Sequence, residues 1–299
     1  MALPVRLPLM VARGGPGPVI GLTAAVHGDE INGIAIIHEL FRKLDLRTLR
    51  GTVAAIPITN VSAFHRHQRY ATPGYDLNHY FPGAAEGADI QVYAHRLLDR
   101  FVRHLDALID LHTASRGRAN CLYVRADMNQ EETARMAYLQ RPHVILHNPA
   151  SDGTLRGAAS ALGVPAITVE VGNPNRFQSE YIRSSVVGLR AVLGERGMIP
   201  RRSVRLGPPP VLCASGTWLY TDSGGLLTVE PQVTDRVREG EVVAELRDAF
   251  GRSVRTYRAP FDGVVIGRAV DPVAITGSRI LHLGRPAEQG AGFVRRADG

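Results

Sequence analysis

The chain has 299 residues, of which 44% are hydrophobic and 21% charged, which is typical of a globular protein with one large domain, alone or with a smaller one. Its formal net charge is +7, but 34 of its 35 basic residues are arginines spread along the whole chain, so we expect no nucleic-acid partner. No segment approaches ~18 consecutive apolar residues and the start of the chain lacks the features of a signal peptide, so we expect no membrane partner and a cytoplasmic location. Cys121 and Cys213 lie far apart and in no metal spacing, and we interpret them as buried thiols of a reducing compartment.

Strand-like and helix-like segments alternate up to about residue 200. Uninterrupted apolar strands that alternate with amphipathic helices favour a mainly parallel sheet that is covered on both faces. The predicted strands span residues 18–26, 51–59, 107–111, 121–127, 143–148 and 165–172, and the predicted helices span 30–44, 94–105, 131–141, 154–163 and 179–197.

The pattern changes near residue 200, so we divide the chain into domains at 1–200 and 201–299. The GPPP segment at 207–210 predicts a linker, and short strands with Gly-rich turns follow without a helical run, which indicates a compact all-β module. Residues 238–248 and 259–267 resemble the β-sandwich of biotinyl and lipoyl carrier domains. Those carriers need a modified lysine, and the only lysine is Lys43, so we expect a structural or site-covering role instead.

Polar residues end three of the clearest predicted strands, at His27, His112 and Glu170. Ligands of open α/β sheets bind beyond the carboxyl ends of the strands. Glu30 follows His27 by three residues, and two imidazoles with one carboxylate form a usual catalytic zinc set that leaves a fourth position for water. A second carboxylate is then needed as general base, and Glu170 is the candidate because it interrupts an apolar strand.

Each of these residues also has a simpler interpretation. A Glu at a helix start also complements the helix dipole, and His112 alone is equally a hydrogen-bonded core histidine. Glu170 alone fits a partner in an interior salt bridge, and Asp110 either caps a turn or orients a ligand histidine. Their joint placement at strand ends favours the metal site.

The segment at 60–83 is a long polar loop with several prolines and glycines, and such loops in compact domains are usually functional or mobile. It contains Arg69, Asn78 and His79. Arginine offers a planar fork that suits a carboxylate or a developing oxyanion, and the alternative is a solvated loop with a surface arginine.

The motifs HGDE, RYATPGYDLNHYFPG, DLHTA and TVEVG, in this order, resemble the succinylglutamate desuccinylase/aspartoacylase family of zinc carboxypeptidase-like hydrolases. The resemblance covers nearly the whole chain. It implies a three-layer αβα domain with a mainly parallel mixed sheet and a small C-terminal all-β, barrel-sandwich-like domain. It also implies one zinc ion per chain. The residues that it implies are the zinc ligands His27, Glu30 and His112, the general base Glu170, Arg69 to polarise the scissile carbonyl, and Asn78 to contact the substrate.

One position departs from this family. The family pattern is DLNRxFPG, whose arginine holds the α-carboxylate of the substrate, whereas this chain has His79. A histidine is shorter, only partly charged at neutral pH and unable to form the bidentate fork. Either another arginine supplies the contact or the substrate is not anionic there. Arg156 is a further candidate, because the family has an arginine in a comparable helix.

These observations predict a zinc-dependent hydrolase that cleaves the amide bond of a small N-acyl amino acid or N-acyl amine. A metallocarboxypeptidase or an esterase with the same site is the first alternative. A metal-dependent binding protein without catalysis is the alternative from another class. The partner we expect is a small acylated molecule, and the β module is a possible contact surface for a homo-oligomer. The acyl group and the amine stay open.

Overall fold

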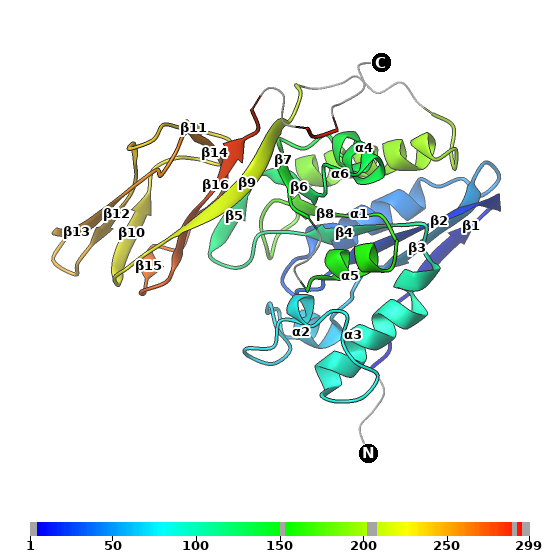
Figure 1. Cartoon of the computed structure of the whole chain (residues 1–299). Coiled ribbons are helices and arrows are strands. Elements are labelled where there is room, and N and C mark those ends of the chain that lie inside the picture. Colours follow the sequence, from blue (N-terminus) through cyan, green and yellow to red (C-terminus); the bar gives the residue numbers. More distant parts are fainter. Residues whose placement is uncertain (1–4, 150–152, 202–207, 289–291, 295–299) are drawn as a thin grey trace.

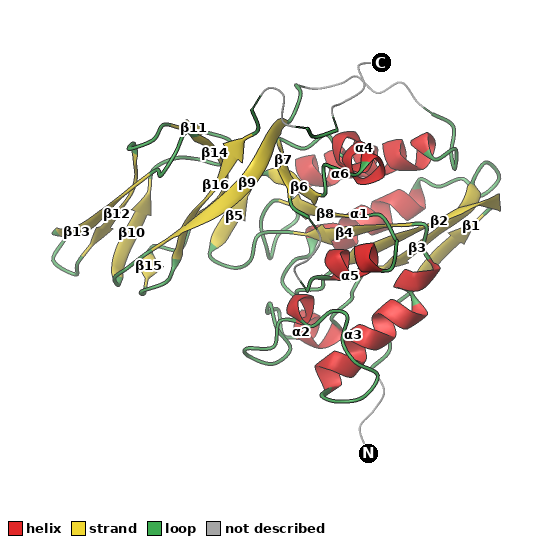
Figure 2. Cartoon of the chain, viewed as in Figure 1, coloured by secondary structure: helices red, strands yellow, loops and turns green. Residues whose placement is uncertain are grey.

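The structure is a computed structural model that describes residues 5–149, 153–201, 208–288 and 292–294. Strands and helices alternate in its first two thirds, and strands alone follow (Figures 1 and 2). The helices are α1 (Asn32–Arg42), α2 (Val61–His65), α3 (Asp89–Arg100), α4 (Glu131–Leu139), α5 (Leu155–Ala161) and α6 (Ser179–Glu195), with short 3-10 helices η1 (Leu77–His79) and η2 (Val102–His104). The strands of this part are β1 (Met10–Arg13), β2 (Gly15–Ala24), β3 (Arg50–Ile56), β4 (Ala107–His112), β5 (Arg118–Asn120), β6 (Leu122–Ala126), β7 (Val144–His147) and β8 (Ala166–Val171).

One large mixed sheet runs through the molecule, in the order β1-β3-β2-β4-β8-β6-β7-β9-β16-β14-β11. The strands β3, β2, β4 and β8 are parallel neighbours, whereas β1 and β6 run antiparallel to β3 and β8. Every residue of β4 and β8 is buried, as expected for parallel strands that are covered on both faces. The predicted mainly parallel, mixed sheet is therefore confirmed.

Helices cover both faces of the sheet. Buried side chains of α1, α4 and α6 pack with one face in the largest apolar cluster, and those of α3 and α5 pack in a second cluster against the other face. In α1 the buried residues include Ile34, Ile37 and Leu40, which share one face at helical spacing. The result is the three-layer αβα arrangement predicted from the sequence, with the carboxyl ends of β2, β4 and β8 free to carry polar residues.

The C-terminal third consists of β9 (Val211–Tyr220), β10 (Gly225–Val229), β11 (Arg236–Val237), β12 (Val242–Arg247), β13 (Ser253–Arg258), β14 (Gly263–Ala269), β15 (Val273–Ala274) and β16 (Arg279–Pro286). The strands β13, β12, β10 and β15 form a separate antiparallel sheet, so the predicted C-terminal all-β region is confirmed. The strand β9 also pairs in parallel with β7, and β14 pairs with β5, so the large sheet continues into this region. Residue 207 of the predicted linker lies outside the described residues, and the boundary at residue 200 stays a prediction.

Several element ends differ from the sequence-based ranges for local reasons. The strand predicted at 51–59 ends at Ile56, because Pro57 cannot donate a ladder hydrogen bond. The helix predicted at 94–105 begins at Asp89 and ends at Arg100, and the following turn is η2. The short elements β1, β5, α2 and η1 were not predicted.

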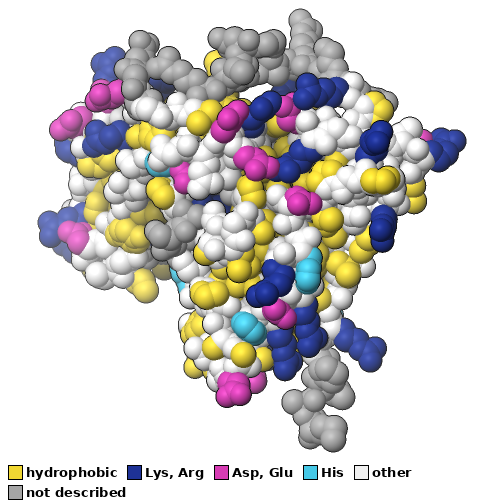
Figure 3. All heavy atoms as spheres, turned by 45° about the vertical axis from the view of Figure 1, so that its right-hand side comes forward, with side chains coloured by type: hydrophobic (Ala, Val, Ile, Leu, Met, Phe, Trp, Pro, Cys, Tyr) yellow, Lys and Arg dark blue, Asp and Glu magenta, His cyan; other side chains and the backbone are white. Residues whose placement is uncertain are grey.

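Charged side chains of both signs are distributed over the surface. On the face in Figure 3, Lys and Arg side chains lie in several groups, and acidic side chains adjoin many of them. The ion pair of Arg135 with Glu131, at 3.6 Å, is one example. Among the described residues, no helix combines the length and apolarity that a membrane span requires.

Candidate active site

The HxxE pair lies in the tight loop that joins β2 to α1. Ala25 adopts the left-handed backbone conformation, with φ of 50°, and turns the chain just before His27. Gly28 lies directly against α2, where an added Cβ would come within 2.0 Å of the backbone of Ala63. Glu30 precedes the first residue of α1 by two positions, so its carboxylate lies outside the first helical turn. From this position it can face the two histidines as well as the start of the helix.

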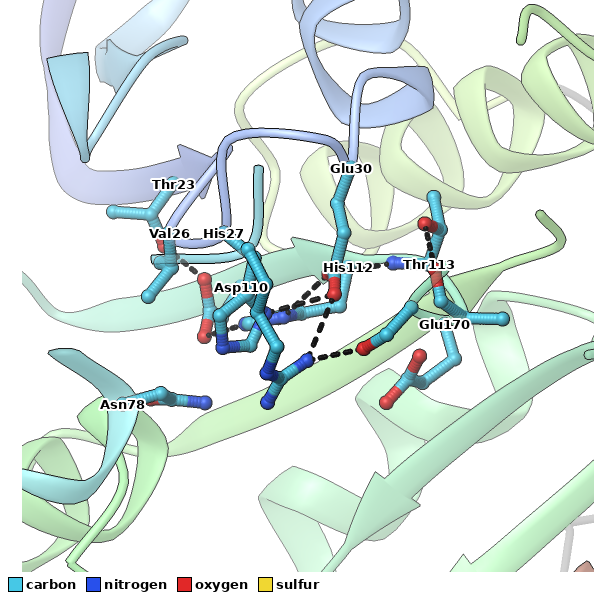
Figure 4. A network of polar contacts seen from close by, with 12 residues as sticks. Thr23, Val26, His27, Glu30, Asn78, Asp110, His112, Thr113 and Glu170 are labelled. Carbon is cyan, nitrogen blue, oxygen red and sulfur yellow. Dashed lines mark hydrogen bonds and ion pairs between the residues drawn. The ribbon is translucent and has the colours of Figure 1, made fainter. Parts of the chain in front are cut away.

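The predicted ligand residues meet in one buried cluster (Figure 4). Oε1 of Glu30 lies 2.8 Å from Nδ1 of His27, and Oε2 lies 3.0 Å from Nδ1 of His112. One ligand atom from each of the three residues lies within 4.8 Å of the others. All three side chains are at most 4% exposed. The two imidazoles thus present the same ring nitrogen to a single carboxylate.

The opposite ring nitrogens each contact an aspartate. Nε2 of His112 lies 2.8 Å from Oδ2 of Asp110, and Nε2 of His27 lies 3.0 Å from Oδ1 of Asp76. Each imidazole therefore lies between two carboxylates, Glu30 on the Nδ1 side and an aspartate on the Nε2 side. Asp110 is held in turn by the Thr23 hydroxyl at 2.7 Å. If a metal ion bound Nδ1, the remaining proton of each ring would lie on Nε2, and the aspartate would accept it and orient the ring.

The carboxylates of this cluster stabilise positive charge on the two histidines. Burial lowers the pKa of His27 and of His112, but the carboxylates around them outweigh it: Glu30 chiefly for His27, Asp110 chiefly for His112, so that both pKa values are raised. Burial raises the pKa of Glu30, yet the two histidines hold it well below its usual range. Buried carboxylates without a compensating positive charge would destabilise the fold. The carboxylates of this cluster therefore need protonated histidines or a metal cation beside them.

The donor set fits a divalent metal ion. Nδ1 of His27 is fully buried and forms no hydrogen bond within the described part of the chain, although Oε1 of Glu30 lies 2.8 Å away. Two imidazoles and a carboxylate, with hydrogen-bonded partners behind the histidines, are the ligand chemistry of catalytic zinc sites. His27, Glu30 and His112 are the residues that would hold the ion.

Glu170 lies beside this cluster on the next strand. Residues 112 and 170 are direct neighbours across the β4–β8 pair, near the carboxyl ends of both strands. The Asn120 amide donates to Oε2 of Glu170 at 3.3 Å, and the Arg125 guanidinium lies 3.5 Å from Oε1. The Glu170 side chain keeps 10% exposure, in contrast to the closed ligand cluster. It is a carboxylate at the edge of the site with access to an incoming molecule.

Arg69 reaches into the site from the loop after α2. It donates to Oδ2 of Asp76 at 2.7 Å and to Oε1 of Glu30 at 3.3 Å, and it also donates to the Ser115 hydroxyl. The side chain is 24% exposed. The guanidinium of Arg69 is therefore fixed beside the ligand cluster, and part of the side chain remains accessible to solvent.

The remaining predicted residues surround the centre at different depths. Asn78 accepts a hydrogen bond from the backbone N–H of Leu155 at 2.9 Å and turns its amide nitrogen toward the cluster (Figure 4). His79 is 65% exposed and lies 3.7 Å from Oδ2 of Asp76. Arg156 is almost fully buried in α5 and donates to the backbone carbonyl of Asn148 at 2.9 Å.

Asp76, Ser115 and Asn120 were not singled out in the sequence analysis, although each contacts a predicted site residue. Asp76 also accepts from the backbone N–H of Asn78 at 3.0 Å and so begins η1. The only sequence signal for a role of Asp76 was its position as the first residue of the DLN motif. Ser115 and Asn120 come to the site only through tertiary folding, because nothing in their local sequence distinguishes them.

A buried histidine–carboxylate cluster that could hold a metal ion lies at the carboxyl ends of a mixed αβα sheet, with the Glu170 carboxylate beside it, and this arrangement resembles the site of a hydrolase. The family model for the succinylglutamate desuccinylase/aspartoacylase catalytic domain matches residues 16–196, and the chain belongs to this family. The resemblance noted in the sequence is thus confirmed.

Individual relatives extend the match beyond the catalytic domain. N-alpha-acetyl-L-2,4-diaminobutyric acid deacetylase of Halomonas elongata is 25% identical over 95% of this chain and 87% of its own length. Succinylglutamate desuccinylase of Pseudomonas aeruginosa is 28% identical over about half of each chain, 52% and 51%. The ectoine utilization protein EutE from Ruegeria pomeroyi, solved with product bound, superimposes with a TM-score of 0.86 at 22% identity, over 94% of this chain and 89% of its own. The Halomonas and Pseudomonas relatives are amide hydrolases by name, and their likeness supports an amide-hydrolysing enzyme. EutE, at 22% identity, shows the shared fold.

Proposed function

We propose that this chain is a zinc-dependent deacylase that hydrolyses the amide bond of a small N-acyl amino acid or N-acyl amine. The observation that carries the proposal is the arrangement of His27, Glu30 and His112, with Glu170 as their neighbour in the sheet. A zinc ion held by these residues would polarise the substrate carbonyl and lower the pKa of a water molecule to about 7.

Glu170 acts as the general base in this proposal. Its carboxylate accepts a proton from the attacking water and then delivers it to the leaving amine nitrogen. The Asn120 amide and the Arg125 guanidinium hold Glu170 in place, one on each oxygen. Both partners thus orient the carboxylate from opposite oxygens.

Arg69 stabilises the oxygen of the scissile carbonyl as negative charge develops on it. Its guanidinium is oriented by Asp76 and Ser115, so little reorganisation is needed when the substrate binds. Asn78 offers a second polar group on the same side, and its fixed Oδ1 leaves the amide N–H groups free to donate to the substrate.

A substrate panel with and without metal tests this function. The amides to try first are N-alpha-acetyl-2,4-diaminobutyrate and N-succinylglutamate, which the names of two relatives suggest, beside short peptides and simple esters. We expect hydrolysis of at least one N-acyl compound, loss of activity with a chelator and recovery with zinc. Preference for peptides or esters would favour a carboxypeptidase or an esterase, and zinc binding without any turnover would favour a binding protein.

A further inference from the structure

Two arginines meet on one indole ring at the junction between the catalytic region and the C-terminal strands. The guanidinium carbon of Arg118, from β5, lies 5.3 Å from the centre of the Trp218 ring, and that of Arg279, from β16, lies 5.0 Å from the same centre. The ring of His282 stacks on Trp218 at 4.7 Å and an angle of 9°. The indole of Trp218, on β9, thus packs against β16, and both guanidiniums lie near its ring.

This arginine pair adjoins the proposed catalytic centre. Arg118 and Asn120 are two residues apart on β5, so their side chains project from the same face of the strand, and Asn120 donates to Glu170. The backbone N–H of Arg118 bonds to the carbonyl of Ser115, whose hydroxyl contacts Arg69. Both ends of β5 are therefore fixed to proposed catalytic side chains.

The positive charge at this junction is only partly compensated. Within the described parts of the chain, neither Arg118 nor Arg279 forms an ion pair with a carboxylate, whereas Arg125 nearby pairs with Glu170. Burial lowers the pKa of Arg118 to about 10. The positive charges of Arg279 and Arg69 act in the same direction, whereas the negative charges of Glu170 and Glu30 oppose them. Arg118 is half-buried and Arg279 is exposed. Two neighbouring guanidiniums favour the binding of an anion, and their planar forks suit a carboxylate.

We propose that Arg118 and Arg279 bind a carboxylate of the substrate, in the part of the substrate that extends from Glu170 toward the C-terminal strands. This inference rests on the proposed deacylase function. It answers the question raised by His79, because another pair of arginines supplies the anion contact. Arg156 is not available for it, since its guanidinium is buried against Asn148.

Trp218 provides a direct readout, because it is the only tryptophan of the chain. The zinc-loaded protein is titrated with succinate and with its neutral analogue succinamide at constant ionic strength, and the tryptophan emission is recorded. We expect a saturable change with succinate alone, weakened about tenfold or more in Arg118→Gln and in Arg279→Gln. Arg252→Gln is the matched control, because Arg252 lies on the C-terminal module and pairs with Asp248 there. Circular dichroism and thermal melting confirm that each variant is folded.

Steady-state kinetics then show whether the arginine pair binds the carboxylate of the amino acid or that of the acyl group. The substrates are an N-acetyl amino acid, an N-succinyl amine and an N-acetyl amine without a carboxylate. We expect Arg118→Gln to raise KM about tenfold or more for whichever of the first two uses the pair, with kcat little changed and the neutral amide unaffected. Equal titration of wild type and both variants by succinate, or an equal response to succinamide, would overturn the inference. If no amide is hydrolysed, the deacylase proposal fails, and the titration still decides whether the arginines bind a carboxylate.

Discussion

Asp76 connects a proposed metal ligand to a proposed catalytic arginine: its Oδ1 lies 3.0 Å from Nε2 of His27, and its Oδ2 accepts from Arg69 at 2.7 Å. Because of these contacts, and despite the opposing effect of burial, the pKa of Asp76 is held well below its usual range. The carboxylate is therefore ionised at neutral pH, and it orients both partners through charge-assisted hydrogen bonds.

Asp76→Asn tests this connection. Asparagine keeps the shape and can still begin η1, so the change removes mainly the charge. We expect zinc affinity or turnover to fall about 10- to 100-fold, as for other partners of metal-binding histidines. Competition with a chromogenic chelator measures the affinity, and Asp99→Asn, at an exposed ion pair with Arg103, is the control. Unchanged affinity and turnover in Asp76→Asn would mean that Asp76 has no such role.

Gly28→Ala tests whether the loop with His27 depends on close packing against α2. The added Cβ would meet backbone atoms of Ala63, which cannot move aside as a flexible side chain would. We expect a loss of about 1–3 kcal/mol in the free energy of unfolding, measured with urea. Gly15→Ala is the control, because its nearest new contact is at 4.0 Å and we expect a change within about 0.5 kcal/mol. Similar stabilities for the two variants would contradict this packing argument.

The thiols are expected to be inert in the folded protein. Cys121 and Cys213 are both fully buried, and burial raises the pKa of the Cys213 thiol to about 12. Since the thiolate is the reactive form, a disulfide reagent at neutral pH should label neither cysteine in the native state and both in urea. Rapid labelling of the native protein would show that this region opens in solution.

Much of the fold could be predicted from the sequence because its signals are local and periodic. The apolar runs at β2, β4 and β8 predicted strands whose ends carry His27, His112 and Glu170, and the structure has these strands. The short strand β5 could not be predicted, since three residues carry no periodic signal and its pairing with β14 is long-range.

Contacts between distant segments also limited the prediction of the site. The motifs pointed to the proposed metal ligands, whereas the contact of Asn120 with Glu170 and the approach of Arg118 to Trp218 depend on segments far apart in sequence.

The zinc content and turnover of two variants, Glu170→Gln and His112→Ala, test the central claim most directly. The wild-type chain should hold one zinc ion and hydrolyse an N-acyl substrate. In Glu170→Gln we expect the zinc to remain and turnover to fall at least about 100-fold, because the base is lost while the ligands are intact. In His112→Ala we expect both to be lost. A near-normal rate in Glu170→Gln, or a full complement of zinc in His112→Ala, would contradict the account.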